Sequence, residues 1–319
     1  METVLKNLFP ELNIFNSAYL NVTEQHTLYY EECGNPKGYP VIFLHGGPGS
    51  GCNAAQRRFF DPEFYRIVLF DQRGCGRSMP AGCIENNTTQ DLIEDIEALR
   101  KHLNISRWMV FGGSWGSTLA LVYAIHHPQS ISGLILRGIF LSRPDELKWF
   151  MHDAQHFFPE AWAKWANYLE ADKRQNILQS YAELVFDADP DIAGPAAVAW
   201  NHYESSIMTL MPRESGASTT PVEVEIARAR VQIHYIQNHC FIDGDAVLKS
   251  CKQLSNIPMT IIQGRYDMVC PPKTAWELFH QTPHAHLEII ADAGHSAMEP
   301  GVTSALVNAT ENFKHSVNR

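Results

Sequence analysis

The sequence predicts an α/β fold in which a mostly parallel central sheet is flanked by helices and carries an inserted helical cap. Short apolar runs recur along the chain, each followed by turn residues, and patterns typical of helices lie between them. The runs are rich in Val, Ile and Leu without strict alternation, as expected for strands covered on both faces. Six such runs are present, at 41–47, 65–74, 107–114, 131–138, 259–267 and 286–295.

The segment TTQDLIEDIEALRKHLN, residues 88–104, predicts one of the intervening helices. Thr88 and Asp91 are suited to cap its start. Its apolar residues fall on one stripe, at Leu92, Ile96, Leu99 and Leu103. Because such helices alternate with the apolar runs, the sequence favours a parallel sheet.

The region from about 140 to 250 breaks this rhythm. It holds four of the seven tryptophans and is typical of helices separated by polar, Pro-containing loops. We therefore expect a helical cap at 140–246, inserted between the two parts of a catalytic core at 1–139 and 247–319. Ligands of open α/β sheets bind at the carboxyl ends of the strands, so the cap is expected to cover that edge.

The composition bounds the class of partner. With 319 residues, of which 45% are hydrophobic, the chain is long enough for one large core and a smaller unit. A formal net charge of −10 would repel the phosphate backbone of nucleic acids and anionic membrane surfaces. A cationic or neutral small substrate fits this charge better.

Cysteine usage and the N-terminal segment bear on the compartment. The seven cysteines are an odd number, include no C-x-x-C pair and match no zinc framework, which favours a reducing compartment. The first residues lack the pattern of a secretory signal, and no run reaches the ~18 apolar residues that span a bilayer. The sequence thus predicts a cytoplasmic protein. It leaves the oligomeric state open, a homo-oligomer included.

The segment VFGGSWGSTLA, residues 110–120, takes the chain from a strand to a helix without a loop. The residue at such a corner adopts a strained backbone conformation, and the residues two positions away must be small, as Gly112 and Gly116 are. The Ser114 hydroxyl is then exposed near a helix N-terminus, which favours a developing anion. This context predicts a nucleophile elbow, and a serine needed only for a tight turn is the alternative.

A serine hydroxyl is a poor nucleophile near neutral pH and needs a base that is itself oriented. Asp267 and His295 each follow a late strand-like run, in GRYDMVCPP and ADAGHSAMEPG. The chain order Ser, Asp, His is that of the α/β hydrolases. We therefore predict Ser114 as nucleophile, His295 as general acid and base, and Asp267 as the group that orients it. A turn aspartate and a structural histidine are the alternatives.

The segment LHGGPGSG, residues 44–51, follows the first core run with glycines that allow backbone to approach a ligand closely. We predict the N–H of Gly47 and the N–H of Trp115 as the two donors of an oxyanion hole. An ordinary glycine turn is the alternative for Gly47. His45 and Pro48 are expected to shape this turn without transferring protons.

The segment DQRGCGRS, residues 71–78, lacks the lysine and the spacing of a phosphate loop. We predict a structural turn held by Asp71, Arg73 and Arg77.

Seven separate blocks carry a resemblance to a known family. In chain order they are HGGPGSG, LFDQRGCGRS, NNTTQDLIEDIE, VFGGSWGSTLALVYA, LRGIF, QGRYDMVCP and DAGHSAMEPG. With these blocks the chain resembles the proline iminopeptidases, or prolyl aminopeptidases, of the α/β-hydrolase superfamily over nearly its full length. The resemblance implies release of N-terminal proline from peptides through an acyl-enzyme formed on Ser114, with no cofactor and no metal.

A serine peptidase that removes one residue from a free N-terminus needs an anion where the ammonium of the substrate lies. The segment AWNHYESS, residues 199–206, resembles the cap segment of the family and implies Glu204 as this anion. A second glutamate of the family corresponds to Gln232 here, which removes a negative charge. Amine recognition is then weaker, or shared with Glu225 or another cap acid.

Aromatic side chains are expected to bound the pyrrolidine ring of the substrate. Phe140, Trp200 and Tyr203 are candidates, although each is equally suited to the core of the cap. Two other functions stay open at this point. One is a broader α/β hydrolase, either an aminopeptidase or an esterase, because fold and nucleophile do not set the substrate. The other is a non-catalytic binding protein on this fold, against which the intact Ser, Asp and His set argues.

Overall fold

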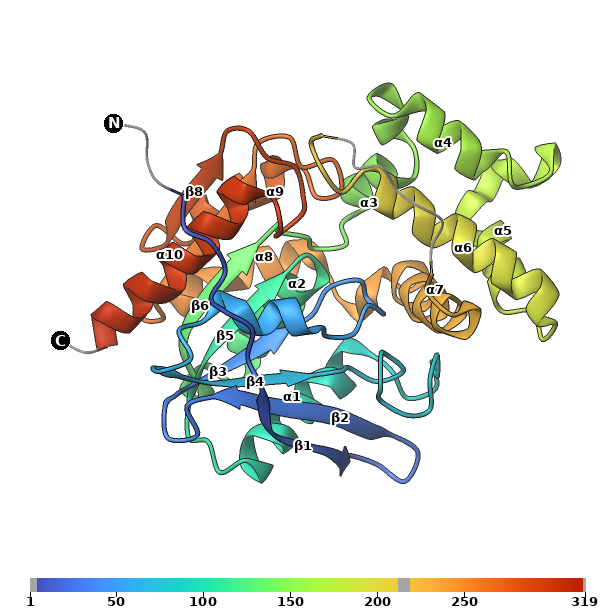
Figure 1. Ribbon diagram of the computed structural model, residues 1–319. Coiled ribbons are helices and arrows are strands. Elements are labelled where there is room, and N and C mark those ends of the chain that lie inside the picture. The colour runs from blue at the N-terminus through green and yellow to red at the C-terminus, as the bar shows by residue number, and fades with distance from the viewer. Residues whose placement is uncertain (1–4, 212–218, 318–319) are drawn as a thin grey trace.

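A central sheet organises the computed structural model, which describes residues 5–211 and 219–317 (Figure 1). Its strands lie in the order β1-β2-β4-β3-β5-β6-β7-β8. β1 pairs antiparallel with β2, β2 pairs antiparallel with β4, and all other neighbours are parallel. The strands are β1 (Ile14–Asn21), β2 (Thr27–Gly34), β3 (Tyr39–Leu44), β4 (Tyr65–Phe70), β5 (Trp108–Gly113), β6 (Ile131–Arg137), β7 (Met259–Gly264) and β8 (His286–Ile290).

All six apolar runs of the sequence contain a strand, from β3 to β8, so the predicted α/β fold with a mostly parallel sheet is confirmed. The sequence analysis missed the hairpin of β1 and β2. β1 is the edge strand, and its side chains alternate between exposed and half-buried, with Tyr19 58% exposed. A strand of this kind carries no continuous apolar run, which is why the pattern did not reveal it.

Helices cover both faces of the sheet. One apolar cluster includes side chains of α1 (Thr89–His102), α2 (Trp115–His126), α8 (Gly244–Ser250) and α9 (Pro272–Gln281). The other includes those of the 3₁₀ helix η1 (Ala54–Phe59) and of α10 (Pro300–Val317), which crosses the near face of the sheet in Figure 1. In the part of the chain that the structure describes, no helix is both long and apolar enough to cross a membrane.

The predicted capping of α1 is confirmed. The Thr88 hydroxyl accepts a hydrogen bond from the N–H of Asp91 at 3.3 Å, and the Asp91 carboxylate accepts one from the N–H of Thr88 at 2.9 Å. Leu92, Ile96 and Leu99 are buried beneath the helix, as their spacing predicted.

Five helices between β6 and β7 form a layer with its own apolar core. They are α3 (Pro144–Met151), α4 (Pro159–Ala166), α5 (Ile177–Val185), α6 (Pro190–Ser206) and α7 (Val222–Gln237). Figure 1 shows α4 to α7 gathered at one side of the molecule. The core of this layer is aromatic: the Trp165 ring stacks on that of Tyr203, with centroids 4.3 Å apart and planes 8° apart. α8 crosses the predicted boundary at 246/247 and packs against α2 and α9, so the exact division into core and cap stays a prediction.

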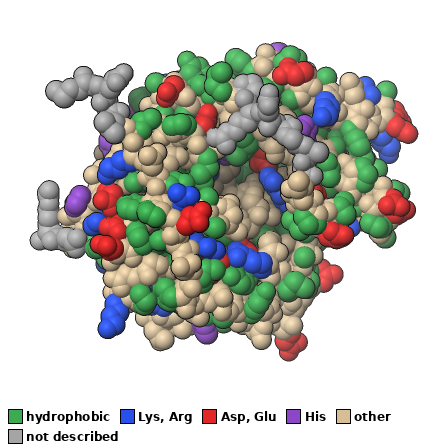
Figure 2. All heavy atoms as spheres, viewed as in Figure 1, with side chains coloured by type: hydrophobic (Ala, Val, Ile, Leu, Met, Phe, Trp, Pro, Cys, Tyr) green, Lys and Arg blue, Asp and Glu red, His purple; other side chains and the backbone are tan. Residues whose placement is uncertain are grey.

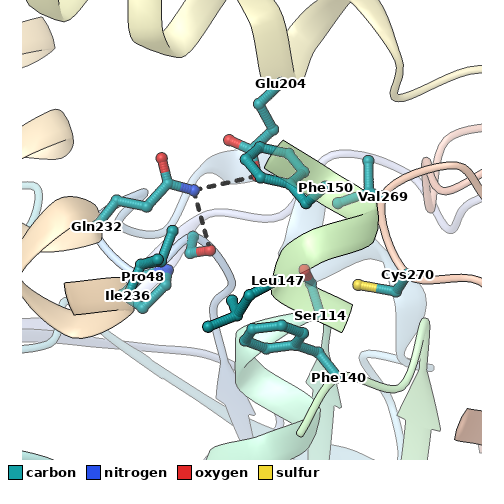
Figure 3. A pocket seen from close by; sticks show the side chains of 11 residues that line it. Pro48, Ser114, Phe140, Leu147, Phe150, Glu204, Gln232, Ile236, Val269 and Cys270 are labelled. Atoms are coloured by element: carbon teal, nitrogen blue, oxygen red, sulfur yellow. Dashed lines mark hydrogen bonds between the residues drawn. The ribbon is translucent and has the colours of Figure 1, made fainter. Parts of the chain in front are cut away.

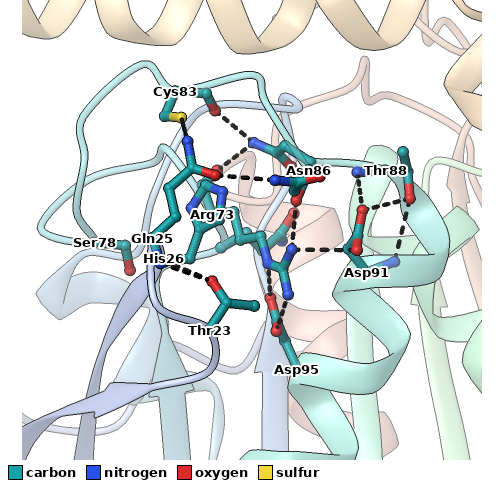
Figure 4. A network of polar contacts seen from close by, with 12 residues as sticks. Thr23, Gln25, His26, Arg73, Ser78, Cys83, Asn86, Thr88, Asp91 and Asp95 are labelled. Atoms are coloured by element: carbon teal, nitrogen blue, oxygen red, sulfur yellow. Dashed lines mark hydrogen bonds and ion pairs between the residues drawn. The ribbon is translucent and has the colours of Figure 1, made fainter.

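The turn after β4 is held by ion pairs, as the sequence predicted. The Asp71 carboxylate accepts from the N–H of Cys52 at 2.6 Å and from Arg77 Nε at 2.7 Å. Arg73 Nε and Nη2 donate to the two carboxylate oxygens of Asp95, both at 2.7 Å, and both side chains are buried (Figure 4). These pairs fix the turn against α1.

We predict that Asp95→Ala lowers the free energy of unfolding by about 3–5 kcal/mol, because it leaves the buried guanidinium of Arg73 without its bidentate carboxylate. Urea unfolding at pH 7 measures the change. Glu94→Ala is the matched control, since Glu94 is the exposed neighbour on the same helix and its removal should change stability by less than ~0.5 kcal/mol. Equal losses in the two variants would contradict the prediction.

Candidate active site

Ser114 occupies a strained corner between β5 and α2. Its backbone has φ 58° and ψ −128°, a conformation that L-residues rarely adopt. A side chain at Gly112 would collide with the carbonyl of Gly116, and one at Gly116 would collide with the carbonyl of Leu44. The Ser114 N–H donates to the carbonyl of Arg137 at 2.8 Å, which ties the corner to β6. Only glycine therefore fits at positions 112 and 116, two residues before and two residues after the serine. The serine itself lies at the carboxyl end of the sheet.

Asp267 and His295 lie together on the loops after β7 and β8. His295 Nδ1 and Asp267 Oδ2 are 2.7 Å apart, and both side chains are buried. Asp267 Oδ1 accepts from the N–H groups of Val269 and Cys270 at 3.0 and 2.7 Å, and Gln263 Nε2 donates to Oδ2 at 3.1 Å. The carboxylate is therefore fixed on every side, and it holds the proton of the imidazole on Nδ1.

Arg137, the last residue of β6, lies against the other nitrogen of this imidazole. Its Nη1 is 3.0 Å from His295 Nε2 and also donates to the His295 carbonyl at 3.0 Å. A guanidinium has no acceptor, so Nε2 is the acceptor of this contact. Burial lowers the pKa of Arg137, and the Asp267 carboxylate raises it in part.

The Ser114 hydroxyl lies beside the thiol of Cys270 (Figure 3). Among the described residues, no hydrogen bond joins this hydroxyl to His295, and the partner of His295 Nε2 is Arg137. Burial raises the pKa of the Cys270 thiol well above its ordinary value, and the Asp267 carboxylate raises it further. The thiol is therefore protonated at neutral pH. The structure thus brings the predicted triad residues to one place, with the Asp–His contact formed and the Ser–His contact open.

Two backbone segments flank Ser114. Gly47, with φ 112°, belongs to the loop after β3, and a Cβ on the adjacent Gly46 would lie 3.3 Å from Ser114 Cβ. Trp115 is the first residue of α2, so its backbone N–H has no acceptor within the helix. Both predicted donors therefore belong to backbone segments next to the serine.

The side chains of His45 and Trp115 are structural. Trp115 Nε1 donates to Gln72 Oε1 at 2.8 Å, and the N–H of Gln72 donates to His45 Nε2 at 3.0 Å. Burial lowers the pKa of His45, which keeps the ring neutral and able to accept this bond. His45 thus shapes the turn, in agreement with the sequence analysis.

A cavity opens above Ser114, between the edge of the sheet and the cap (Figure 3). The space between the atoms of its wall, open solvent included, is about 390 Å³. The polar side chains at its wall are Ser114, Glu204, Gln232 and Cys270. The rest of its lining is mostly apolar and consists of Gly47, Pro48, Phe140, Leu147, Phe150, Ile236 and Val269.

Glu204 reaches the cavity from α6, on the cap side opposite Ser114 (Figure 3). It is 6% exposed, and its Oε2 pairs with Arg228 Nη2 at 2.9 Å. Gln232 Nε2 donates to Glu204 Oε1 and to the carbonyl of Gly47, both at 3.3 Å. Gln232 therefore joins the cap to the loop after β3.

The structure separates the three predicted aromatic residues. Phe140 lines the cavity, but Trp200 and Tyr203 are buried in the core of the cap and are not part of its wall. Trp200 Nε1 donates to Gln232 Oε1 at 2.7 Å, and the Tyr203 hydroxyl donates to the carbonyl of Phe150. Trp200 and Tyr203 therefore do not bound the cavity. They hold Gln232 and Phe150, which do. Glu225 is also outside the lining, where it accepts from Asn201 Nδ2 at 2.6 Å.

Sequence reasoning missed Arg137, Arg228 and most of the apolar wall. Arg137 had a signal, since it is a charged residue that ends an otherwise apolar strand. The wall residues Leu147, Phe150 and Ile236 had none, because apolar residues of cap helices face either the cap core or the cavity, and only tertiary packing decides which.

The chain matches known sequences over nearly its whole length. A family model described as alpha/beta hydrolase fold matches residues 39–302. A proline iminopeptidase of Xylella fastidiosa (strain 9a5c) is 46% identical over 97% of this chain and 100% of its own. One of Neisseria gonorrhoeae is 44% identical over 94% and 96%, and one of Arabidopsis thaliana is 45% identical over 97% and 82%.

Solved structures with lower identity share the fold. A putative aryl esterase from Burkholderia cenocepacia superposes with a TM-score of 0.66 at 17% identity, over 95% of this chain and 100% of its own. An alpha/beta fold family hydrolase from Bacillus anthracis str. Sterne gives a TM-score of 0.62 at 21% identity, over 93% and 100%.

We predict that Gly116→Ala slows the labelling of Ser114 by a fluorophosphonate probe at least tenfold and lowers the free energy of unfolding by about 1–3 kcal/mol. The added methyl group would force α2 away from the carbonyl of Leu44. Glu94→Ala, at an exposed position of α1, is the control and should change neither the labelling nor the stability. Unchanged labelling in Gly116→Ala would show that the corner tolerates a side chain.

Proposed function

The chain belongs to the proline iminopeptidases of the alpha/beta hydrolase fold family, and from this premise we propose that it releases N-terminal proline from peptides through an acyl-enzyme on Ser114. The observation that carries the proposal is the cavity itself. It has a serine at a strained corner on one side, a buried carboxylate on the other, and apolar walls between them. A small apolar ring with a charged nitrogen is complementary to such a cavity.

In the proposed reaction His295 Nε2 takes the hydroxyl proton while Ser114 Oγ attacks the carbonyl carbon of proline. The oxygen that becomes negative faces the N–H groups of Gly47 and Trp115. His295 then gives the proton to the departing amine, and the ester on Ser114 is hydrolysed by water in the same way. Asp267 keeps the imidazole in the required tautomer throughout. The first step requires Nε2 to exchange its contact with Arg137 for one with Ser114.

In the proposed complex, Glu204 receives the protonated imino nitrogen and the apolar wall surrounds the pyrrolidine ring. A blocked or internal proline would leave the buried carboxylate without this partner, which is unfavourable. Residues that precede the proline would also run into the cap at α6. Both effects support an exopeptidase in preference to an endopeptidase.

We expect prolyl arylamide to be the best substrate in a panel with alanyl and acetyl-prolyl arylamides. Turnover should fall by ~10⁴-fold or more in Ser114→Ala, because the nucleophile is removed. Circular dichroism checks that this variant keeps its fold, and Ser106→Ala on the surface is the control. Equal rates on the free and blocked prolyl substrates would contradict the proposal, and equal rates on alanyl and prolyl substrates would indicate a broader aminopeptidase.

We further expect Glu204→Gln to raise KM for prolyl arylamide and to lower kcat/KM by about tenfold, the effect of losing one buried charge-assisted contact. Glu223→Gln, which removes an exposed carboxylate at the start of α7, should leave the kinetics unchanged. If the two variants behave alike, Glu204 is not the amine anchor.

A further inference from the structure

The carboxylate that faces the cavity already has a cationic partner. Arg228 Nη2 lies 2.9 Å from Glu204 Oε2, on the turn of α7 that precedes Gln232. The Arg228 side chain is 30% exposed, whereas that of Glu204 is 7% exposed. Figure 2 shows that the molecule is hollowed on the face in view, with both Lys or Arg and Asp or Glu side chains around the hollow.

The other contacts of Glu204 add no negative charge. Its Oε1 accepts from Gln232, a neutral amide that is itself held by Trp200 and by the carbonyl of Gly47. Among the described residues that line the cavity, Glu204 is the one carboxylate. The charges of Glu204 and Arg228 cancel. The negative charge proposed to bind the N-terminal cation of the substrate is therefore already neutralised before the substrate binds.

The surroundings of the Arg228 side chain allow its guanidinium to move away from Glu204. Its backbone is fixed, because its carbonyl packs against Gly49 in the loop after β3. In the part of the chain that the structure describes, Glu204 is the one hydrogen-bond acceptor of its guanidinium, and Arg228 Nε is buried without a hydrogen bond. Because the guanidinium has one partner and the side chain is partly exposed, it can turn towards solvent when another cation binds the Glu204 carboxylate.

We propose that Arg228 is a specificity-determining residue that competes with the substrate's imino group for Glu204. The inference rests on the proposed function, in which Glu204 is the amine anchor. Binding of a protonated nitrogen then requires displacement of the guanidinium or close approach of two like charges, and both are unfavourable. An uncharged ring of the same shape does not meet this cost. Arg228 therefore reduces the preference of the site for a charged over an uncharged N-terminal group.

The test compares prolyl arylamide with cyclopentanecarbonyl arylamide, which has the same ring size and no nitrogen. In Arg228→Gln we expect the ratio of kcat/KM for the two substrates to rise about tenfold in favour of proline, through a lower KM for proline. Arg230→Gln is the matched control, since Arg230 lies on the same helix and donates to the carbonyls of Val185 and Asp187. Its ratio should stay within about twofold of the wild-type value. A ratio that is unchanged or lower in Arg228→Gln overturns the inference.

A binding measurement makes the test independent of turnover. In the Ser114→Ala background, calorimetry gives the Kd of L-prolinol, a cation, and of cyclopentylmethanol, its uncharged counterpart. Arg228→Gln should tighten prolinol binding about tenfold and leave cyclopentylmethanol unchanged. Arg228→Met keeps the length of the side chain without its charge and should give the same shift, so the test survives if one variant fails to fold.

The two hypotheses fail in different ways. If no arylamide is turned over but prolinol binding tightens on removal of Arg228, the proposed function fails and the competition for Glu204 stands. If prolyl arylamide is turned over but neither the ratio nor prolinol binding changes, the inference about Arg228 fails and the proposed function stands. Absence of prolinol binding in every variant overturns the inference as well.

Discussion

The backbone at Ser114 is the constraint on which the site depends. A non-glycine residue at φ 58° costs on the order of 1–3 kcal/mol and persists only where its surroundings leave no alternative. Here the glycines at 112 and 116 let β3, β5 and α2 approach within backbone contact, and the bond from the Ser114 N–H to Arg137 closes the turn on the side of β6. The close approach places a hydroxyl next to a helix N-terminus and beside the loop of Gly47, so one strained residue sets the relative position of the predicted nucleophile and the two predicted donors.

Parallel pairing brings the remaining groups to this corner. β5, β6, β7 and β8 are successive parallel neighbours, so Ser114, Arg137, Asp267 and His295 all follow or end strands at the same edge of the sheet. Arg137 is the unexpected member, because it contacts Nε2 of His295, the nitrogen that accepts the serine proton in the proposed reaction. Catalytic hydrogen bonds are often incomplete before the substrate is bound.

The parts that could be predicted from the sequence are those set by local pattern. Six strands, the capping of α1 and the turn at Asp71 depend on residues close together in the chain, and the order of Ser114, Asp267 and His295 depends on strand ends that the pattern reveals. Trp200 and Tyr203 could not be placed, because an aromatic residue of a cap helix is equally suited to the cap core and to the cavity. Arg228 was missed for a related reason: only the packing of α7 against α6 shows that it faces Glu204 instead of solvent.

The cap does more than enclose the cavity, because its polar contacts connect the Glu204 carboxylate to the loop after β3. Gln232 donates both to Glu204 and to the carbonyl of Gly47, and Arg228 packs its own carbonyl against Gly49 in the same loop. A change in the partner of Glu204 therefore acts on a helix, α7, that contacts the loop beside Ser114 at two points. In the proposed complex the charge of the substrate ring is met on the cap side of the cavity, and α7 is the element through which that side contacts the loop of Gly47 and Gly49.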